Sequence, residues 1–246
     1  MRRAALLALL LAWAAPAWAA TCENIRHDDI GYTICTVDMA QEDLRLFLYD
    51  EAGDVLGQFS AVDRALGAQG QRLGFAMNAG MYHDDRAPVG HYVEDGRELM
   101  RVIPNAGPGN FGLLPNGILC IRDGRADVFE TLRFVDAAPD CTYATQSGPM
   151  LVIDGALHPR FLADGTSRYV RNGVGTSADG RTAIFAISNS TVTFHEFGRL
   201  FRDRLQTPNA LFLDGNISRL YAPDLRRSDI GFSMGPIIGT VEPAAR

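Results

Sequence analysis

The segment Asn209–Ser218 combines an apolar run with a carboxylate at its end. Residues 210–213 read Ala-Leu-Phe-Leu, which is typical of a fully buried strand. Asp214 and Gly215 follow directly, and Asp-Gly is a turn signal. A packed strand would hold the backbone of Asp214 rigidly while its carboxylate reaches open space, as a catalytic or metal-binding carboxylate requires. The alternative is a plain turn at the end of a strand, capped by the Asp214 side chain.

Three further segments repeat this design, since each joins small residues to a polar or charged residue beside an apolar strand. They are Asn78-Ala79-Gly80, Gln146-Ser147-Gly148-Pro149 and the run from Arg171 to Gly175. Small residues leave room for a ligand and expose backbone N–H groups. Each segment taken alone is more typical of a tight turn, so it is their recurrence that indicates a ligand site.

In this order the motifs resemble the phosphodiester glycosidase family. The matching positions are Asn78–Gly80, Gln146–Pro149 with Leu151 and Asp154-Gly155, Arg171–Gly175 with Asp179-Gly180, and Leu213–Gly215 with Ser218. The resemblance covers most of the chain and implies a divergent exported bacterial member. Many members have glycines where this chain has Ala79, Asn216 and Ile217, and Asn216 and Ile217 add bulk where glycines would let the substrate lie against the backbone.

The resemblance implies hydrolysis of the bond between a sugar anomeric carbon and a phosphodiester oxygen. Such a reaction passes through an oxocarbenium-like transition state that needs a carboxylate nearby. The leaving phosphate needs a fixed cation, and the planar guanidinium of arginine binds phosphate oxygens in a bidentate way. We therefore predict Asp214 as nucleophile, base or calcium ligand and Arg171 as the phosphate-binding group, with Arg168 as its alternative. A structural ion pair is the other interpretation of Arg171.

The resemblance also implies a set of supporting residues. Asn78 is predicted to hydrogen-bond the substrate or to hold Asp214. The predicted substrate-binding residues are Gly80, Gly148, Pro149, Asn172, Gly215 and Ser218. Ser218 is expected to support the Asp214 turn, because no Gly-x-Ser-x-Gly motif marks it as a nucleophile.

Two other functions are consistent with the sequence. Asn216 and Ile217 would suit a module that binds glycans or phosphoglycans without turnover. A calcium-assisted phosphodiesterase that cuts the P–O bond is the other alternative. His83, Asp84 and Asp85 could contact a metal, although an exposed polar loop is the simpler interpretation. We predict no metal site and no certain cofactor, with calcium possible.

Strand and turn patterns dominate the chain that must position these residues. Strands are expected at 32–37, 44–49, 150–153 and 182–188, with a hairpin formed by 117–121 and 126–129. Helices are expected at 61–68 and 194–205. Thr193 and Glu196 have the spacing of a capping box at the start of the second helix, which explains Glu196 without a catalytic role. The sequence predicts an α+β fold with a β-rich mixed or antiparallel sheet core, a few helices and a single compact domain at 20–246.

The N-terminal residues 1–19 have the features of a secretory signal peptide. Two arginines precede an apolar stretch, and Ala17-Trp18-Ala19 matches a cleavage site. The stretch is too short for a stable membrane span, and no second run is long and apolar enough to be one. We expect cleavage near Ala19 and a secreted or periplasmic protein.

Net charge and cysteine content indicate which partners the protein can bind and in which cellular compartment it folds. The formal net charge is −6, which disfavours nucleic acid or an anionic membrane as a partner. The family resemblance implies a carbohydrate phosphodiester or envelope glycan as the substrate. The cysteines are Cys22, Cys35, Cys120 and Cys141, and an even number in an exported chain suggests two disulfides. Three pairings are possible, and the shortest loops favour Cys22–Cys35 and Cys120–Cys141. Zinc is the less favoured reading because no Cys-x-x-Cys motif is present.

Overall fold

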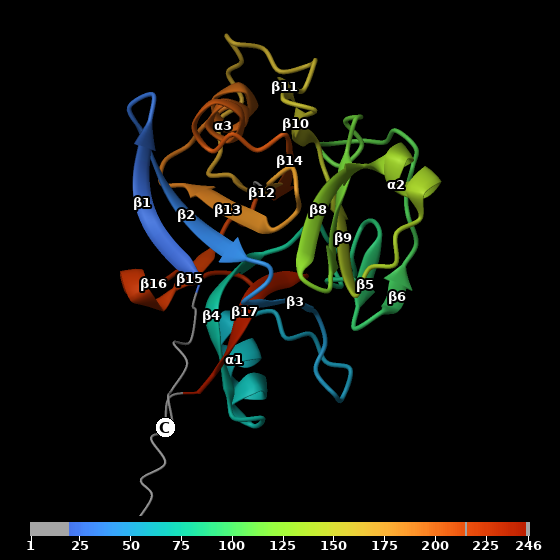
Figure 1. Cartoon of the computed structure of the whole chain (residues 1–246), viewed down its shortest axis with the longest axis vertical. Coiled ribbons are helices and arrows are strands. Elements are labelled where there is room, and N and C mark those ends of the chain that lie inside the picture. Colours follow the sequence, from blue (N-terminus) through green and yellow to red (C-terminus); the bar gives the residue numbers. More distant parts are fainter. Residues whose placement is uncertain (1–19, 215, 245–246) are drawn as a thin grey trace, which may run out of the picture.

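A computed structural model describes residues 20–214 and 216–244, which form three antiparallel sheets (Figure 1). The expected signal peptide at 1–19 and the predicted site residue Gly215 lie outside the described residues. The largest sheet has seven strands in the order β1-β2-β13-β12-β14-β10-β11. Its strands are β1 (Thr21–His27), β2 (Ile30–Asp38), β10 (Met150–Ile153), β11 (Ala156–Leu157), β12 (Asn172–Thr176), β13 (Thr182–Ser188) and β14 (Asn209–Asp214).

The other two sheets have five strands each. The order of the second sheet is β16-β15-β4-β17-β3, and that of the third is β6-β5-β9-β7-β8. The second contains β3 (Asp43–Phe47), β4 (Gln71–Asn78), β15 (Leu220–Ala222), β16 (Arg227–Ser228) and β17 (Ile237–Pro243). The third contains β5 (Tyr92–Glu94), β6 (Arg97–Met100), β7 (Gly117–Arg122), β8 (Arg125–Glu130) and β9 (Tyr143–Ser147). The predicted hairpin is β7 and β8, which pair from Gly117–Glu130 to Arg122–Arg125.

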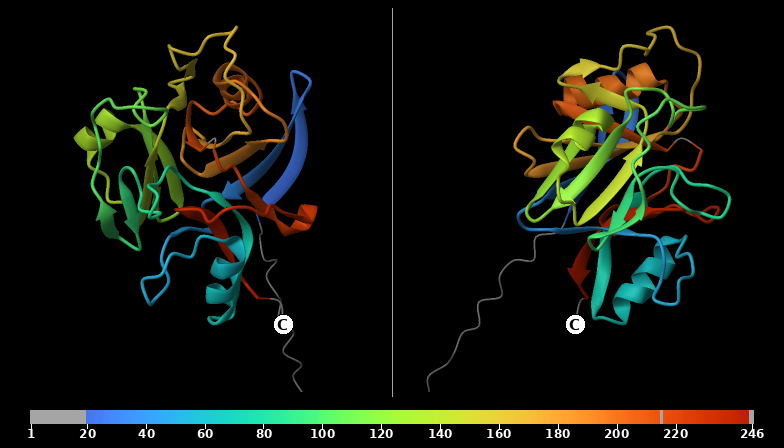
Figure 2. Two further views of the ribbon diagram at one scale, coloured as in Figure 1. Left: turned by 180° about the vertical axis from the view of Figure 1, so that it is seen from behind. Right: turned by 90° about the vertical axis from the view of Figure 1, so that its right-hand side faces the viewer.

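The helices lie on the outside of the sheets (Figures 1 and 2). α1 (Phe59–Gly67) packs on β4, α2 (Thr131–Ala137) lies beside β8, and α3 (Phe194–Arg199) packs against β10. A π-helical turn (Leu200–Arg204) extends α3, and a short 3-10 helix (Pro223–Leu225) follows β15. The predicted capping box is present: the Glu196 backbone N–H donates to Thr193 Oγ1 over 3.1 Å, and the Thr193 N–H donates to Glu196 Oε2 over 2.8 Å.

One buried cluster joins all three sheets. It contains Leu213 of β14 from the first sheet, Phe75 of β4 from the second and Leu119 of β7 from the third. Because these sheets share a core, the described chain is a single compact domain of the predicted fold class. Disulfides link Cys22 to Cys35 and Cys120 to Cys141, which are the pairings that the shortest loops favour.

Within residues 20–214 and 216–244, no helix is both long enough and apolar enough to span a membrane.

Candidate active site

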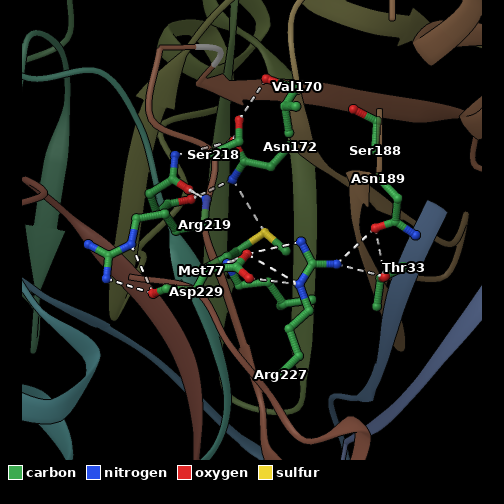
Figure 3. Close-up of polar contacts among 12 residues, drawn as sticks. Thr33, Met77, Val170, Asn172, Ser188, Asn189, Ser218, Arg219, Arg227 and Asp229 are labelled. Carbon is green, nitrogen blue, oxygen red and sulfur yellow. Dashed lines mark hydrogen bonds and ion pairs between the residues drawn. The ribbon is translucent and has the colours of Figure 1, made fainter. Parts of the chain in front are cut away.

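A buried amide network joins the ends of β4, β12 and β14. The Oδ1 of Asn172 accepts a hydrogen bond from the backbone N–H of Asp214 over 3.1 Å and another from Nδ2 of Asn78 over 3.2 Å. In return, Nδ2 of Asn172 donates to the carbonyl oxygen of Asn78 over 2.8 Å. Ser218 Oγ lies 2.8 Å from the carbonyl oxygen of Asp214, and Figure 3 shows Ser218 and Met77 beside Asn172. The network therefore fixes the backbone that carries the Asp214 carboxylate.

A bulge in β14 sets the direction of that carboxylate. Phe212 lies opposite Gly173 and Asp214 lies opposite Asn172, so Leu213 is an extra residue on β14. Directly opposed residues of an antiparallel pair project from the same face of the sheet, and a bulge re-aims the side chains that follow it. The Asp214 side chain therefore projects on the same face as Asn172, toward β4, rather than with Phe212 toward α3.

Asp214 contributes to the wall of a cavity of about 660 Å³. The cavity lies between the segments that follow β4, precede β7 and follow β14. Its lining residues are Met81, Tyr82, His83, Asp84, Arg86, Val89, Pro108, Gly109, Asn110, Phe111, Asp214, Asn216, Ile217 and Phe232. Its volume is within the range of pockets that hold small ligands. Asp214 is 8% exposed, so its carboxylate reaches the cavity from an otherwise buried strand end.

Tyr82 and Arg86 place a phenol and a guanidinium in the same cavity as Asp214. Burial raises the pKa of Tyr82, and the negative charge of Asp214 raises it further. The guanidinium carbon of Arg86 lies 5.3 Å from the centre of the Tyr82 ring. Arg86 Nη1 donates to the carbonyl oxygen of Asp84 over 2.7 Å, whereas its buried Nε has no hydrogen-bond partner within the described part of the chain. The cavity thus offers a cation that can bind an anionic ligand beside a carboxylate.

Arg171 occupies a different place from the one expected. Its side chain is 1% exposed, and its guanidinium carbon lies 3.6 Å from the centre of the Phe194 ring, on the side of the sheet that α3 covers. Nε donates to the carbonyl oxygen of Val192 over 3.0 Å, and Nη2 to that of Ser167 over 3.2 Å. Arg171 is absent from the cavity wall, because successive residues of an extended chain point to opposite faces and Asn172 takes the face toward β4. Arg171 and Asp214 therefore do not share one cavity, contrary to the expectation from the sequence.

Arg168, the alternative cation, also lies outside the cavity wall. Its Nη1 donates to Oε1 of Glu196 over 3.0 Å, so it forms an ion pair at the start of α3.

Gly80, Gly148 and Pro149 are buried around the network and do not line the cavity. Gly80 has φ +145°, and a Cβ on it would lie 2.9 Å from Oγ1 of Thr145. A Cβ on Gly148 would lie 2.6 Å from the Cβ of Asn116, so only glycine fits there without movement. The carbonyl oxygen of Pro149 accepts from the N–H of Phe212 over 3.1 Å. These residues bring β4, β9 and β14 close together.

The structure places Asp214, a predicted site residue, in the cavity wall, whereas the sequence did not single out the residues on the opposite wall as site residues. Tyr82, Arg86, Phe111 and Phe232 come from connecting segments with no motif of their own. The position of Arg86 could have indicated a cation near the site, because it lies six residues after Gly80 and directly after two aspartates. We interpreted that segment as a polar loop.

The described residues contain no group of three or more His, Cys, Asp and Glu side chains that could hold a metal ion. His83 and Asp84 both line the cavity, but they do not form such a cluster.

Comparison with known proteins defines the class to which this fold and site belong. The sequence profile of the family described as phosphodiester glycosidase matches residues 71–229, more than half of the chain. The chain belongs to the phosphodiester glycosidase family. Among individual proteins, it is 29% identical over 208 residues to the uncharacterized protein YigE of Escherichia coli strain K12, covering 84% of this chain and 81% of YigE.

Solved structures share the fold at 12% sequence identity. The catalytic domain of zebrafish N-acetylglucosamine-1-phosphodiester alpha-N-acetylglucosaminidase, auto-inhibited by its pro-peptide, superposes with a TM-score of 0.62 and covers 93% of this chain and 85% of its own. A hypothetical protein from Synechocystis superposes with a TM-score of 0.61. The match covers 90% of this chain and 61% of the Synechocystis chain. A putative exported protein from Burkholderia pseudomallei K96243 superposes with a TM-score of 0.56. The match covers 86% of this chain and 74% of the Burkholderia chain.

Proposed function

We propose that this protein is an exported hydrolase that cleaves the bond between the anomeric carbon of a sugar and a phosphodiester oxygen. The observation that carries the proposal is that Asp214 and Arg86 line one cavity. Membership of the phosphodiester glycosidase family supports the reaction class. Relatives of known activity are distant, so the assignment of roles rests on the geometry of this chain.

The chemistry assigns a separate role to each charged group. Asp214 stabilises the oxocarbenium-like transition state, as nucleophile or as base for water. Phosphate is a weak base and can leave without a strong acid, but the charge that develops on it needs a fixed partner, which Arg86 supplies. Tyr82 supports this arrangement, because its ring lies beneath the Arg86 guanidinium and its hydroxyl donates to the carbonyl oxygen of Ser233.

The amides act through Asp214 rather than on the substrate. Asn172 and Asn78 are fully buried and hold the backbone of Asp214 and of the residues around it. Gly80, Gly148, Pro149 and Ser218 complete this support, and Gly215 is proposed to let the substrate approach the backbone.

Export is proposed on three grounds. The N-terminal sequence has the pattern of a signal peptide. Two disulfides fit an oxidising compartment. A protein of similar fold is described as a putative exported protein.

The variant Asp214→Asn tests the proposal. The mature protein should release free sugar from a synthetic sugar-1-phosphate ethyl diester, and the variant should lose about 1,000-fold in kcat, because an amide cannot act as nucleophile or base. Asp164→Asn, at an exposed position, is the matched control and should keep wild-type activity. Full activity of Asp214→Asn would remove this carboxylate from the mechanism.

Binding without turnover is a second candidate. Asn216 and Ile217 line the cavity at positions where glycines would leave more space. Saturable calorimetric binding of a sugar phosphodiester, with no product after long incubation, would favour this alternative.

A further inference from the structure

Residues 229–233 present two large apolar side chains to solvent beside the cavity. Ile230 is 92% exposed and Phe232 is 81% exposed, and Phe232 also belongs to the cavity wall. We call this pair the apolar rim. Exposed apolar groups that adjoin a ligand cavity are typical of recognition surfaces, whereas single scattered ones are not.

The backbone of this segment is firmly anchored, so the exposure of the rim is a built feature. Nε and Nη2 of Arg219 donate to the carbonyl oxygen of Asp229 over 3.1 Å and 2.7 Å, a contact drawn in Figure 3. Nη1 of Arg219 donates to the carbonyl oxygen of Phe232 over 2.9 Å. Nε2 of Gln58 donates to the carbonyl oxygen of Gly231 over 3.2 Å. These bonds hold the main chain inward and leave the rim side chains in water.

The same arginine connects the rim to the network beneath Asp214. The backbone N–H of Arg219 donates to Oδ1 of Asn78 over 2.9 Å, and Asn78 in turn bonds Asn172. The rim is therefore fixed relative to the carboxylate rather than carried by an independent loop.

The rim also continues the surface around Arg86. The guanidinium of Arg86 lies over the Tyr82 ring, and the Tyr82 hydroxyl donates to the carbonyl oxygen of Ser233 over 3.4 Å. Ser233 directly follows Phe232. Tyr82 thus links the segment that carries Arg86 to the segment that carries the rim, and Arg86 and Phe232 line the same cavity.

The size of the rim limits what can cover it. Two side chains fall far below the roughly 800 Å² that each partner buries in a stable protein interface, so a second copy of the chain does not fit. A polar aglycone would gain nothing from isoleucine and phenylalanine. A flexible chain of several methylene groups matches both the area and the chemistry.

We propose that the aglycone of the substrate, the alcohol on the far side of the phosphate, is an apolar alcohol whose hydrocarbon chain packs on Ile230 and Phe232. This inference rests on the proposed function and defines its substrate class as sugar-1-phosphodiesters of lipid-like alcohols. Val89, Phe111 and Ile217 extend the apolar surface into the cavity.

Two substrates that differ only in the aglycone test the proposal. The mature protein is assayed on ethyl and octyl diesters of the same sugar 1-phosphate, both below the micellar concentration of the octyl compound. Each methylene removed from water improves affinity about fourfold, so partial burial of the octyl chain should lower KM at least tenfold. The double variant Ile230→Ser, Phe232→Ser should lose most of this ratio, and the single variant Ile230→Ser should reduce it without altering the cavity wall.

Leu132→Ser is the matched control, since Leu132 is 55% exposed on α2 and lies outside the cavity wall. It should keep the wild-type ratio, and thermal unfolding should show that every variant is folded. Equal KM values for the two diesters, or an octyl preference that survives in the double variant, would overturn the inference while leaving the proposed function intact. Hydrolysis of neither diester would overturn both.

Discussion

Arg86 and Arg171 carry the same functional group in two different environments. Burial lowers the pKa of Arg171 to about 10, and its guanidinium stacks on Phe194 while it donates to backbone carbonyls. Such a side chain fixes the packing between β12 and α3. Arg86 instead lines the cavity that contains Asp214, whereas Arg171 is absent from its wall, although each arginine has one buried nitrogen without a partner among the described residues. Of these two arginines, Arg86 is the one placed to pair with a substrate phosphate.

A pair of arginine variants separates these roles. Arg86→Gln should reduce kcat/KM by about 100-fold to 1,000-fold, the usual effect of removing one group that stabilises developing charge. Arg171→Met should lower the free energy of unfolding by about 3 kcal/mol, because buried carbonyl groups lose their donors, yet leave kcat/KM of the folded protein near the wild-type value. Steady-state kinetics and urea unfolding of both variants provide the measurements. A selective loss of activity in Arg171→Met would contradict the assignment.

The sequence predicted Asp214 correctly as the end of a strand but could not predict its companion. A short apolar run followed by Asp-Gly is a local pattern that needs no knowledge of the rest of the chain. The place of Arg86 depends on how the segment after β4 packs against residues 108–111 and 216–217, which are distant in sequence. The side of the sheet on which Arg171 lies depends on the pairing register of the strand, and the register cannot be predicted from composition.

At the scale of elements, strong periodic patterns gave reliable predictions. The predicted hairpin is β7 and β8, and the predicted capping box begins α3. The helix expected at 194–205 is present as α3 with a π-helical turn in its second half. The bulge at Leu213 was not predictable, because a bulge changes the pairing without changing the apolar pattern of the strand.

The amide network provides a prediction at this scale. Asn172→Ala removes the acceptor of the Asp214 N–H and the donor to the carbonyl oxygen of Asn78. Unsatisfied buried polar groups are costly, so the free energy of unfolding should fall by about 3 kcal/mol, and kcat should fall with it as the carboxylate loses its fixed position. Asn105→Ala, at an exposed position between β6 and β7, should change stability by less than about 1 kcal/mol. Equal stability of the two variants in urea would exclude a supporting role for Asn172.

At the scale of the whole molecule, the site lies where strands from different sheets meet. β4 belongs to the second sheet, whereas β12 and β14 belong to the first, and Ser147 of β9 donates to the carbonyl oxygen of Leu213 from the third. Short-range patterns predicted the fold class, the single domain and the disulfides, since these depend on composition and spacing. The order of strands could not be predicted, because β17 near the C-terminus pairs with β3 and β4 near the N-terminus.

The central claim is that water attacks the sugar carbon rather than phosphorus in the cavity of Asp214 and Arg86. Hydrolysis of a sugar-1-phosphate ethyl diester in oxygen-18 water, followed by mass spectrometry of the phosphate monoester product, tests this claim most directly. Cleavage of the C–O bond leaves both original bridging oxygens on phosphorus, so we expect the monoester to carry no label. An oxygen-18 atom in the phosphate would show cleavage of the P–O bond and would contradict the account.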